Sequence, residues 1–160
     1  MNIEVYDNFL PTEVFNPIKE FVFGGVMPWY YMDNSVKKGD GCPQFSHGLY
    51  GNSEPRSEVY EIVKPIFATL NPFAIHRVKF NATSRTTEIK EKPLHVDITG
   101  PSDSPEPPFE NIPDYHICVI YFNDNNGYTY FEDGQKVLSK ENRAVMFSGD
   151  LLHAGTSCTD

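Results

Sequence analysis

The fold class is decided by the stretch YHICVIYFNDNNGYTYFEDG, which covers residues 115–134. Residues 115–122 form a largely apolar run rich in β-branched and aromatic side chains, as expected of a strand that is buried on both faces and central in its sheet. Residues 123–127 predict a turn, residues 128–131 a second strand, and Asp133-Gly134 the tight turn of a β-hairpin. Short strands that follow one another this closely indicate an antiparallel β fold.

Strand-like patterns continue on both sides of this stretch. They cover residues 73–81, 93–98, 135–138, 143–147 and 151–154. Residues 100–114, with five Pro residues among acidic ones, predict an irregular loop. The second half of the chain is therefore expected to consist of short strands.

The first 70 residues are expected to be mainly helical. Thr12 is suited to be the N-cap of a first helix that ends at Gly24-Gly25. Ser57 is suited to cap a second helix with an apolar stripe over residues 59–70, in which Pro65 is an irregularity.

Helices followed by many short strands indicate a mainly β protein with N-terminal helices, and specifically a double-stranded β-helix, or jelly roll. At 160 residues, 39% of them apolar, the chain is long enough to bury a substantial core. We expect a single domain over residues 1–160, with a helical cap and loops over 1–70 and the jelly-roll core over 73–160.

Composition limits the partners. The chain carries 13 basic and 22 acidic residues, a net charge of −9 that a phosphate backbone repels, so no nucleic-acid partner is expected. No apolar run approaches the length of a membrane span, and the first residues lack the basic flank of a signal peptide, so we expect a cytoplasmic protein without a membrane partner. Cys42, Cys118 and Cys158 show neither metal-site nor disulfide spacing, which fits reduced thiols.

The candidate metal ligands are His95, Asp97 and His153. In His95-Val96-Asp97 both ligand side chains lie on one side of an extended backbone, because side chains in a strand alternate with period 2. Two imidazoles and one carboxylate can occupy one face of an octahedral metal and leave the other face open, as in non-haem Fe(II) oxygenases. The triplet alone also fits an exposed His beside a solvated Asp.

Five segments taken together and in order resemble the 2-oxoglutarate/Fe(II)-dependent dioxygenases. The closest branch is the prolyl-4-hydroxylase-like one, including its small cyanobacterial and phage members. The resemblance covers the half of the chain from Arg77 onward. Its segments are HVD at 95–97, YFN at 121–123, GYTYF at 127–131, NRAVMF at 142–147 and HAG at 153–155.

The resemblance implies an enzyme that holds Fe(II) through His95, Asp97 and His153. It implies that Tyr121 contacts the distal carboxylate of the cosubstrate 2-oxoglutarate, the alternative being a core aromatic residue with its hydroxyl at the rim. It also implies a polar cosubstrate contact at Asn81. The implied reaction hydroxylates an unactivated C–H bond of a peptidyl prolyl residue or a small molecule with O₂, while 2-oxoglutarate loses CO₂ to give succinate.

Two loops, residues 26–55 and 100–114, are candidates for a lid over the iron or, equally, for irregular surface coverage. The sequence departs from the family at its end. Family members carry an Arg or Lys on the strand after the distal His, which binds the 2-oxoglutarate carboxylate. Here the chain stops at Asp160, 7 residues beyond His153, without that cation or a final strand. We therefore expect a C-terminally truncated jelly roll; completion by a second copy in a homo-oligomer, and Arg143 as a substitute anchor, are the alternatives.

The rival from another class is a non-catalytic, cupin-like jelly-roll module that binds a metal or small ligand. A hydrolytic zinc site is a poorer fit, because it needs a general base near the metal-bound water and none can be assigned.

Overall fold

The computed structural model describes residues 3–97 and 115–160. The chain is mainly β, with 15% of its residues helical and 31% in strands, which confirms the predicted class. It forms two compact units: unit one comprises Met1–Phe9 and Arg85–Asp160, and unit two comprises Leu10–Ser84. The predicted loop at 100–114 and the last residue of the predicted strand at 93–98 lie outside the described residues. The single domain stays a prediction.

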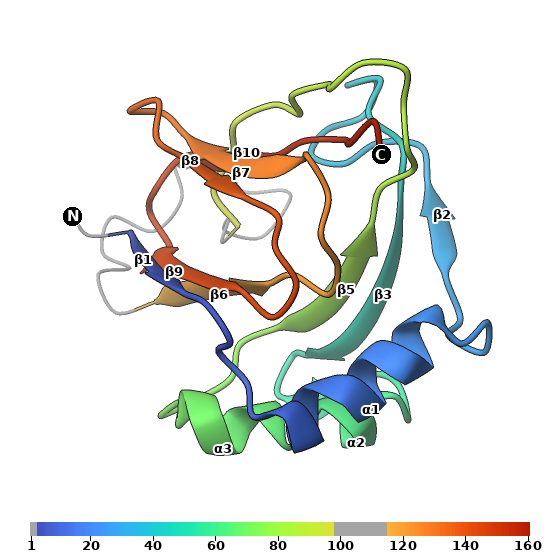
Figure 1. The fold of residues 1–160 in the computed structure, drawn as a ribbon, viewed down its shortest axis with the longest axis vertical. Coiled ribbons are helices and arrows are strands. Elements are labelled where there is room, and N and C mark those ends of the chain that lie inside the picture. The colour runs from blue at the N-terminus through green and yellow to red at the C-terminus, as the bar shows by residue number, and fades with distance from the viewer. Residues whose placement is uncertain (1–2, 98–114) are drawn as a thin grey trace. The chain divides into compact units, whose positions relative to one another are not determined.

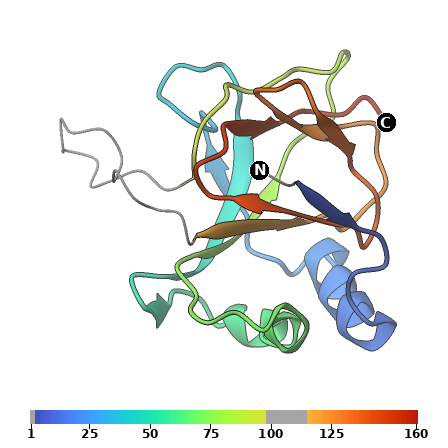
Figure 2. The same cartoon turned by 90° about the vertical axis from the view of Figure 1, so that its left-hand side faces the viewer.

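Unit one carries two antiparallel sheets of three strands each in the described part of the chain, with the orders β1-β9-β6 and β10-β7-β8 (Figure 1). Its strands are β1 (Glu4–Tyr6), β6 (His116–Ile120), β7 (Tyr128–Phe131), β8 (Lys136–Leu138), β9 (Ala144–Ser148) and β10 (His153–Gly155). The two sheets lie as separate layers in both ribbon views (Figures 1 and 2).

The core of unit one joins these two layers. Phe131 and Val137 come from one sheet, Val145 and Phe147 come from the other, and all four are buried in one hydrophobic cluster. The rings of Phe131 and Phe147 meet edge to face with centroids 5.0 Å apart. Burying each such side chain contributes about 1.5–3 kcal/mol. Unit one is therefore a small β-sandwich closed by aromatic and β-branched side chains.

The hairpin predicted from Asp133-Gly134 is confirmed. β7 and β8 pair antiparallel, and Gly134 has a φ of 87°, a left-handed conformation that glycine adopts without steric cost. Its N–H donates to the carbonyl oxygen of Phe131 at 3.0 Å.

The prediction that residues 115–122 form a central strand is wrong in its position. β6 is an edge strand of the described sheet and is only half-buried, whereas β9 lies between β1 and β6 and is almost completely buried. The neighbour that makes β9 central is β1, whose three residues are all exposed, so that no buried face marks this strand in the sequence. Apolar character on both faces thus indicated a strand but not its place in the sheet.

In unit two, α1 (Thr12–Phe23) ends at Gly24 as predicted and buries Phe15, Ile18 and Val22. Thr12 is its first helical residue and not its N-cap. That position is taken by Pro11, which makes no side-chain cap hydrogen bond.

The second predicted helix is divided at Pro65 into α2 (Tyr60–Val63) and α3 (Ile66–Leu70). Proline lacks the N–H that a continuous helix needs at this position, so the irregularity expected at Pro65 is a break. Ser57 does not cap the helix itself; its hydroxyl accepts a hydrogen bond from the Val59 N–H at 3.1 Å, one turn before α2.

The prediction that residues 26–55 form a loop region is wrong. They contain β2 (Tyr30–Met32), β3 (Gln44–Gly51) and β4 (Glu54–Pro55). β3 also pairs with β5 (Val78–Ala82), which is shorter than the strand expected at 73–81. The first 70 residues are accordingly not mainly helical. The inward positions of β3 are His47 and Leu49, and a buried His does not count toward an apolar alternation.

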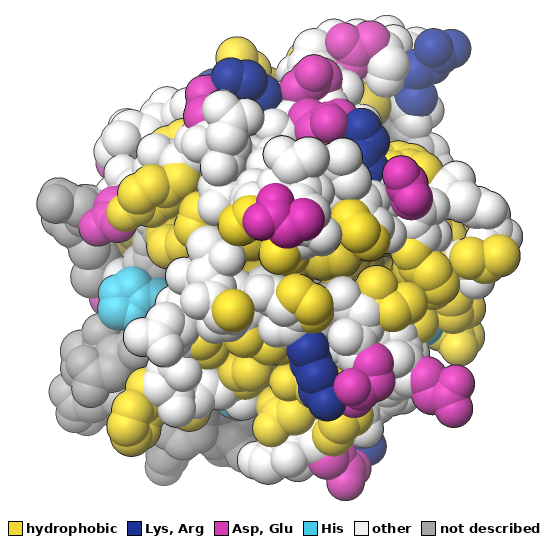
Figure 3. Space-filling view, turned by 60° about the horizontal axis from the view of Figure 1, so that its bottom comes forward, with side chains coloured by type: hydrophobic (Ala, Val, Ile, Leu, Met, Phe, Trp, Pro, Cys, Tyr) yellow, Lys and Arg dark blue, Asp and Glu magenta, His cyan; other side chains and the backbone are white. Residues whose placement is uncertain are grey.

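Several large hydrophobic side chains of unit two remain exposed, among them Phe23, Val26, Tyr30 and Tyr31. Figure 3 shows hydrophobic side chains interspersed with acidic ones on the face that carries the helices. Among the described residues, none of the helices combines the length and the apolar character needed to cross a membrane.

Candidate metal centre

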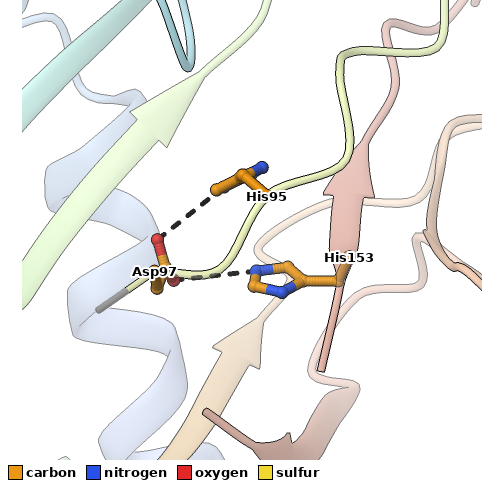
Figure 4. A group of neighbouring side chains, drawn as sticks. All are labelled: His95, Asp97 and His153. Carbon is orange, nitrogen blue, oxygen red and sulfur yellow. Dashed lines mark ion pairs between the residues drawn. The ribbon is translucent and has the colours of Figure 1, made fainter. Parts of the chain in front are cut away.

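His95, Asp97 and His153 lie together in unit one (Figure 4). His153 is the first residue of β10, and the backbones of His95 and His153 form an antiparallel bridge in which each N–H donates to the other's carbonyl oxygen at 3.0 Å. A second bridge joins Glu91 to Thr156. The segment that carries His95 and Asp97 is thus held by isolated bridges and is not the regular strand predicted over residues 93–98.

The ligand atoms of these three side chains all lie within 4.8 Å of one another. The Asp97 carboxylate is 3.8 Å from Nε2 of His95 and 3.7 Å from Nε2 of His153, and Figure 4 shows it directed toward both rings. The two imidazole rings have their centroids 4.8 Å apart. No other such cluster of His, Cys, Asp or Glu side chains was found in residues 3–97 and 115–160.

Both histidines are oriented by a backbone carbonyl two residues earlier in the chain. Nδ1 of His153 lies 2.9 Å from the Leu151 carbonyl oxygen, and Nδ1 of His95 lies 3.2 Å from that of Pro93. A carbonyl oxygen only accepts hydrogen bonds, so each neutral ring carries its proton on Nδ1 and its lone pair on Nε2. The atoms with lone pairs are therefore those that face the Asp97 carboxylate, as in metal sites where the outer partner sets the His tautomer.

The two histidines differ in burial. The His153 side chain is 7% exposed, and its ring packs on Phe147 with centroids 4.6 Å apart and on Phe131 at 6.5 Å. The His95 and Asp97 side chains are 26% and 16% exposed. Within this group, His153 packs in the sandwich core, whereas His95 is accessible to solvent.

The donor set fits a divalent transition metal. Two imidazole nitrogens and one carboxylate oxygen are ligands that Fe(II), Co(II), Mn(II) and Zn(II) all accept. Metal–nitrogen bonds of about 2.1 Å place neighbouring octahedral ligands about 3 Å apart. The three ligand atoms, which lie within 4.8 Å of one another, would therefore have to approach one another further to hold an ion.

Tyr121 lies directly after β6 and packs against the same hydrophobic cluster. Its hydroxyl donates to Oγ1 of Thr129 at 2.7 Å. Burial raises the pKa of Tyr121, so the phenol stays protonated at neutral pH. The phenol is thus a neutral donor whose present partner is on β7, which is compatible with both roles weighed for it.

Asn81 belongs to unit two, on β5, where its side-chain oxygen accepts a hydrogen bond from the Ser46 hydroxyl at 3.1 Å. The three candidate ligands and Tyr121 all belong to unit one. Asn81 and the candidate ligands therefore belong to different units, and the cosubstrate contact implied for Asn81 stays a prediction.

Arg143 is engaged elsewhere in unit one. Its Nε donates to Asp7 at 2.6 Å, a second guanidinium nitrogen donates to the same carboxylate at 3.1 Å, and a third nitrogen donates to the Leu138 carbonyl oxygen. The Arg143 guanidinium, with Lys140, holds the pKa of Asp7 well below its usual range. This bidentate pair ties β1 to the start of β9, which argues against Arg143 as the substitute cosubstrate anchor.

Sequence reasoning missed the groups that orient the ligands. The carbonyl oxygens of Pro93 and Leu151 have no side-chain signature, although each lies two residues before its histidine. Tyr130, whose hydroxyl donates to the Lys92 carbonyl oxygen at 2.5 Å, was visible only as a strand residue.

Comparisons with known proteins assign no family. A scan against protein-family models and searches of curated proteins and of solved structures found no match to this chain. The functional argument therefore depends on the residues of the site and their geometry.

Proposed function

We propose that this protein is a 2-oxoglutarate- and Fe(II)-dependent oxygenase that hydroxylates an unactivated C–H bond of a peptidyl prolyl residue or a small molecule. One observation carries the proposal: the ligand atoms of His95, Asp97 and His153 lie within 4.8 Å of one another, and the Asp97 carboxylate is 3.8 and 3.7 Å from the two Nε2 atoms. The order of sequence segments that resembles the prolyl-4-hydroxylase-like dioxygenases is its second support.

In this proposal the three side chains hold Fe(II) and leave the rest of its coordination sphere to small molecules. When bound, the iron supplies the oxidising chemistry, in which O₂ and 2-oxoglutarate are consumed and succinate, CO₂ and the hydroxylated product are formed. A single carboxylate among the ligands leaves the centre with a net positive charge, which favours an anionic cosubstrate. The carbonyl oxygens of Pro93 and Leu151 keep the histidine rings in the tautomer that binds metal.

The partly buried hydroxyl pair Tyr121–Thr129 is the proposed contact for the distal carboxylate of 2-oxoglutarate. Because Tyr121 donates to Thr129, the Thr129 hydroxyl retains a proton for a further acceptor. Thr129 is 5% exposed, and a hydrogen bond to a carboxylate is stronger in such surroundings than in water. Asn81 is retained as a second, weaker candidate contact.

For the finer fold we propose a jelly roll. Two features of unit one support this topology: its two facing sheets, and the bridges that join Glu91 to Thr156 and His95 to His153 beside β10. We also propose a cytoplasmic location, because Cys42, Cys118 and Cys158 are free thiols in the structure.

The test is an anaerobic titration with Fe(II) and 2-oxoglutarate, in which the weak visible charge-transfer band of the ternary complex is recorded. We expect the band in the wild type, its loss in His95→Ala and its persistence in His116→Ala, a matched control at an exposed histidine of β6. Metal binding without the band, and without succinate release under O₂, would instead establish the cupin-like alternative. Absence of metal binding would refute the proposed site itself.

A further inference from the structure

Residues 86–97, here called the strap, carry two of the three candidate ligands but belong to no regular strand. The strap runs antiparallel to the segment that begins with β10. Its early part is hydrogen-bonded to Ser157, since the Lys90 N–H donates to the Ser157 hydroxyl at 2.9 Å and the Ser157 N–H donates to the Lys90 carbonyl oxygen at 3.0 Å. Its late part is held by the bridge between His95 and His153.

Between these two ends, the strap is hydrogen-bonded to a tyrosine of β7, the strand on the other side of β10. The Lys92 N–H donates to the Gly155 carbonyl oxygen of β10 at 3.2 Å, and the Lys92 carbonyl oxygen accepts the hydroxyl proton of Tyr130 at 2.5 Å. Tyr130 lies on β7, where it is paired with Ala154 of β10. Because β10 pairs with β7 and bridges to the strap, the Tyr130 side chain spans β10 to reach the strap.

This contact bears directly on the candidate ligands. Lys92 is three residues before His95. Its N–H is bonded to β10, and its carbonyl oxygen is bonded to the Tyr130 hydroxyl. A ligand that must be ordered on binding reduces the metal affinity, because the lost conformational entropy opposes binding. A clamp on the strap therefore prepares His95 and Asp97 for the metal before the metal arrives.

We propose that Tyr130 is a positioning residue for the metal centre: its hydroxyl clamps the strap at Lys92 and so sets the affinity with which His95, Asp97 and His153 bind a divalent transition metal. This inference rests on the proposed metal site. The Tyr130–Lys92 hydrogen bond itself is present in the metal-free protein.

The test compares Tyr130→Phe with the matched variant Tyr128→Phe. Tyr128 lies on the same face of β7 two residues earlier. Its hydroxyl also reaches the strap, but it donates to the exposed side chain of Glu91 at 2.8 Å, which Lys136 also contacts at 3.2 Å, and not to the strap backbone. Co(II) serves as the probe, with its visible absorption titrated to give a dissociation constant. Loss of one hydrogen bond predicts about 3- to 10-fold weaker Co(II) binding in Tyr130→Phe, and less than about 2-fold in Tyr128→Phe.

Amide hydrogen exchange of the metal-free proteins supplies the readout that a general loss of stability would not reproduce. In Tyr130→Phe the N–H groups of Lys92 and His95 should exchange faster, whereas that of Val119 in β6 should not change. Equal Co(II) affinity in Tyr130→Phe and wild type, or equal weakening in both variants, would overturn the inference. A wild type that binds no Co(II) would overturn the metal site and the inference together, and the exchange data would then show only whether the strap is clamped.

Discussion

Replacing His95 and His153 separately with Ala should distinguish a ligand at the rim of the fold from a ligand in its core. The His153 side chain is 7% exposed and packs on Phe147, so its truncation leaves a cavity and should lower the free energy of unfolding of the metal-free protein by about 2–4 kcal/mol. The His95 side chain is 26% exposed, and its truncation should cost only about 1 kcal/mol or less.

The response to metal should be the same in both variants. A metal present at about 100 times its dissociation constant stabilises the protein that binds it by about 2.7 kcal/mol. For a chain of this length that corresponds to an increase in Tm of about 5–10 °C. The wild type should show this increase, and neither variant should, because each lacks one of three ligands.

Differential scanning calorimetry with and without Mn(II) measures both quantities. His116→Ala is the control, since His116 is exposed at the start of β6 and lies outside the ligand group, and it should keep the full metal response. A metal-induced rise in Tm that survives in His95→Ala would refute the assignment of the ligands. Equal losses of metal-free stability in His95→Ala and His153→Ala would refute the reasoning from burial.

Three further predictions concern the framework of unit one. A Cβ at Gly127 would lie 2.8 Å from Oδ1 of Asn125 and 3.0 Å from the Ser157 carbonyl oxygen, so Gly127→Ala should lower the urea-derived free energy of unfolding by about 1–3 kcal/mol; an unchanged value would show that the neighbours yield. The folded-state pKa of Asp7 lies well below its unfolded value, so the stability that Asp7 contributes is present above the unfolded pKa and is lost as pH falls through the acidic range. The free energy of unfolding of Asp7→Asn should therefore depend less steeply on pH below about 4 than that of the wild type. An unaltered slope would contradict this. Burial raises the pKa of the Cys118 thiol from 9.0 to about 12, so alkylation of Cys118 at pH 8, followed by mass spectrometry, should be about 1,000-fold slower in the folded than in the unfolded protein; comparable rates would show that the thiol is not buried.

The three candidate ligands and their order along the chain could be predicted from sequence. A His-x-Asp triplet and a later His within an apolar stretch are local signals, and the structure places the three side chains within 4.8 Å of one another. The hairpin at Asp133-Gly134 and the end of α1 at Gly24 could also be predicted from local signals, because each depends on the backbone preferences of a few adjacent residues.

What surrounds these residues could not be predicted in the same way. β3 escaped notice because one of its inward positions is His47, whose Nδ1 is satisfied by the Pro28 carbonyl oxygen 19 residues earlier in the chain. β9 is central because β1 pairs with it from the start of the chain. Arg143 is occupied by Asp7, also far away in sequence.

The sequence by itself thus determined a mainly β chain, its principal turns, and which side chains can act as metal ligands, because backbone propensity and donor chemistry are properties of single residues and their neighbours. Only the tertiary structure decided which strand is central, which tautomer each histidine adopts and how the strap is clamped by Tyr130. These features depend on hydrogen bonds between segments that are distant along the chain, and such pairings are set by the packing of the whole unit and leave no local pattern.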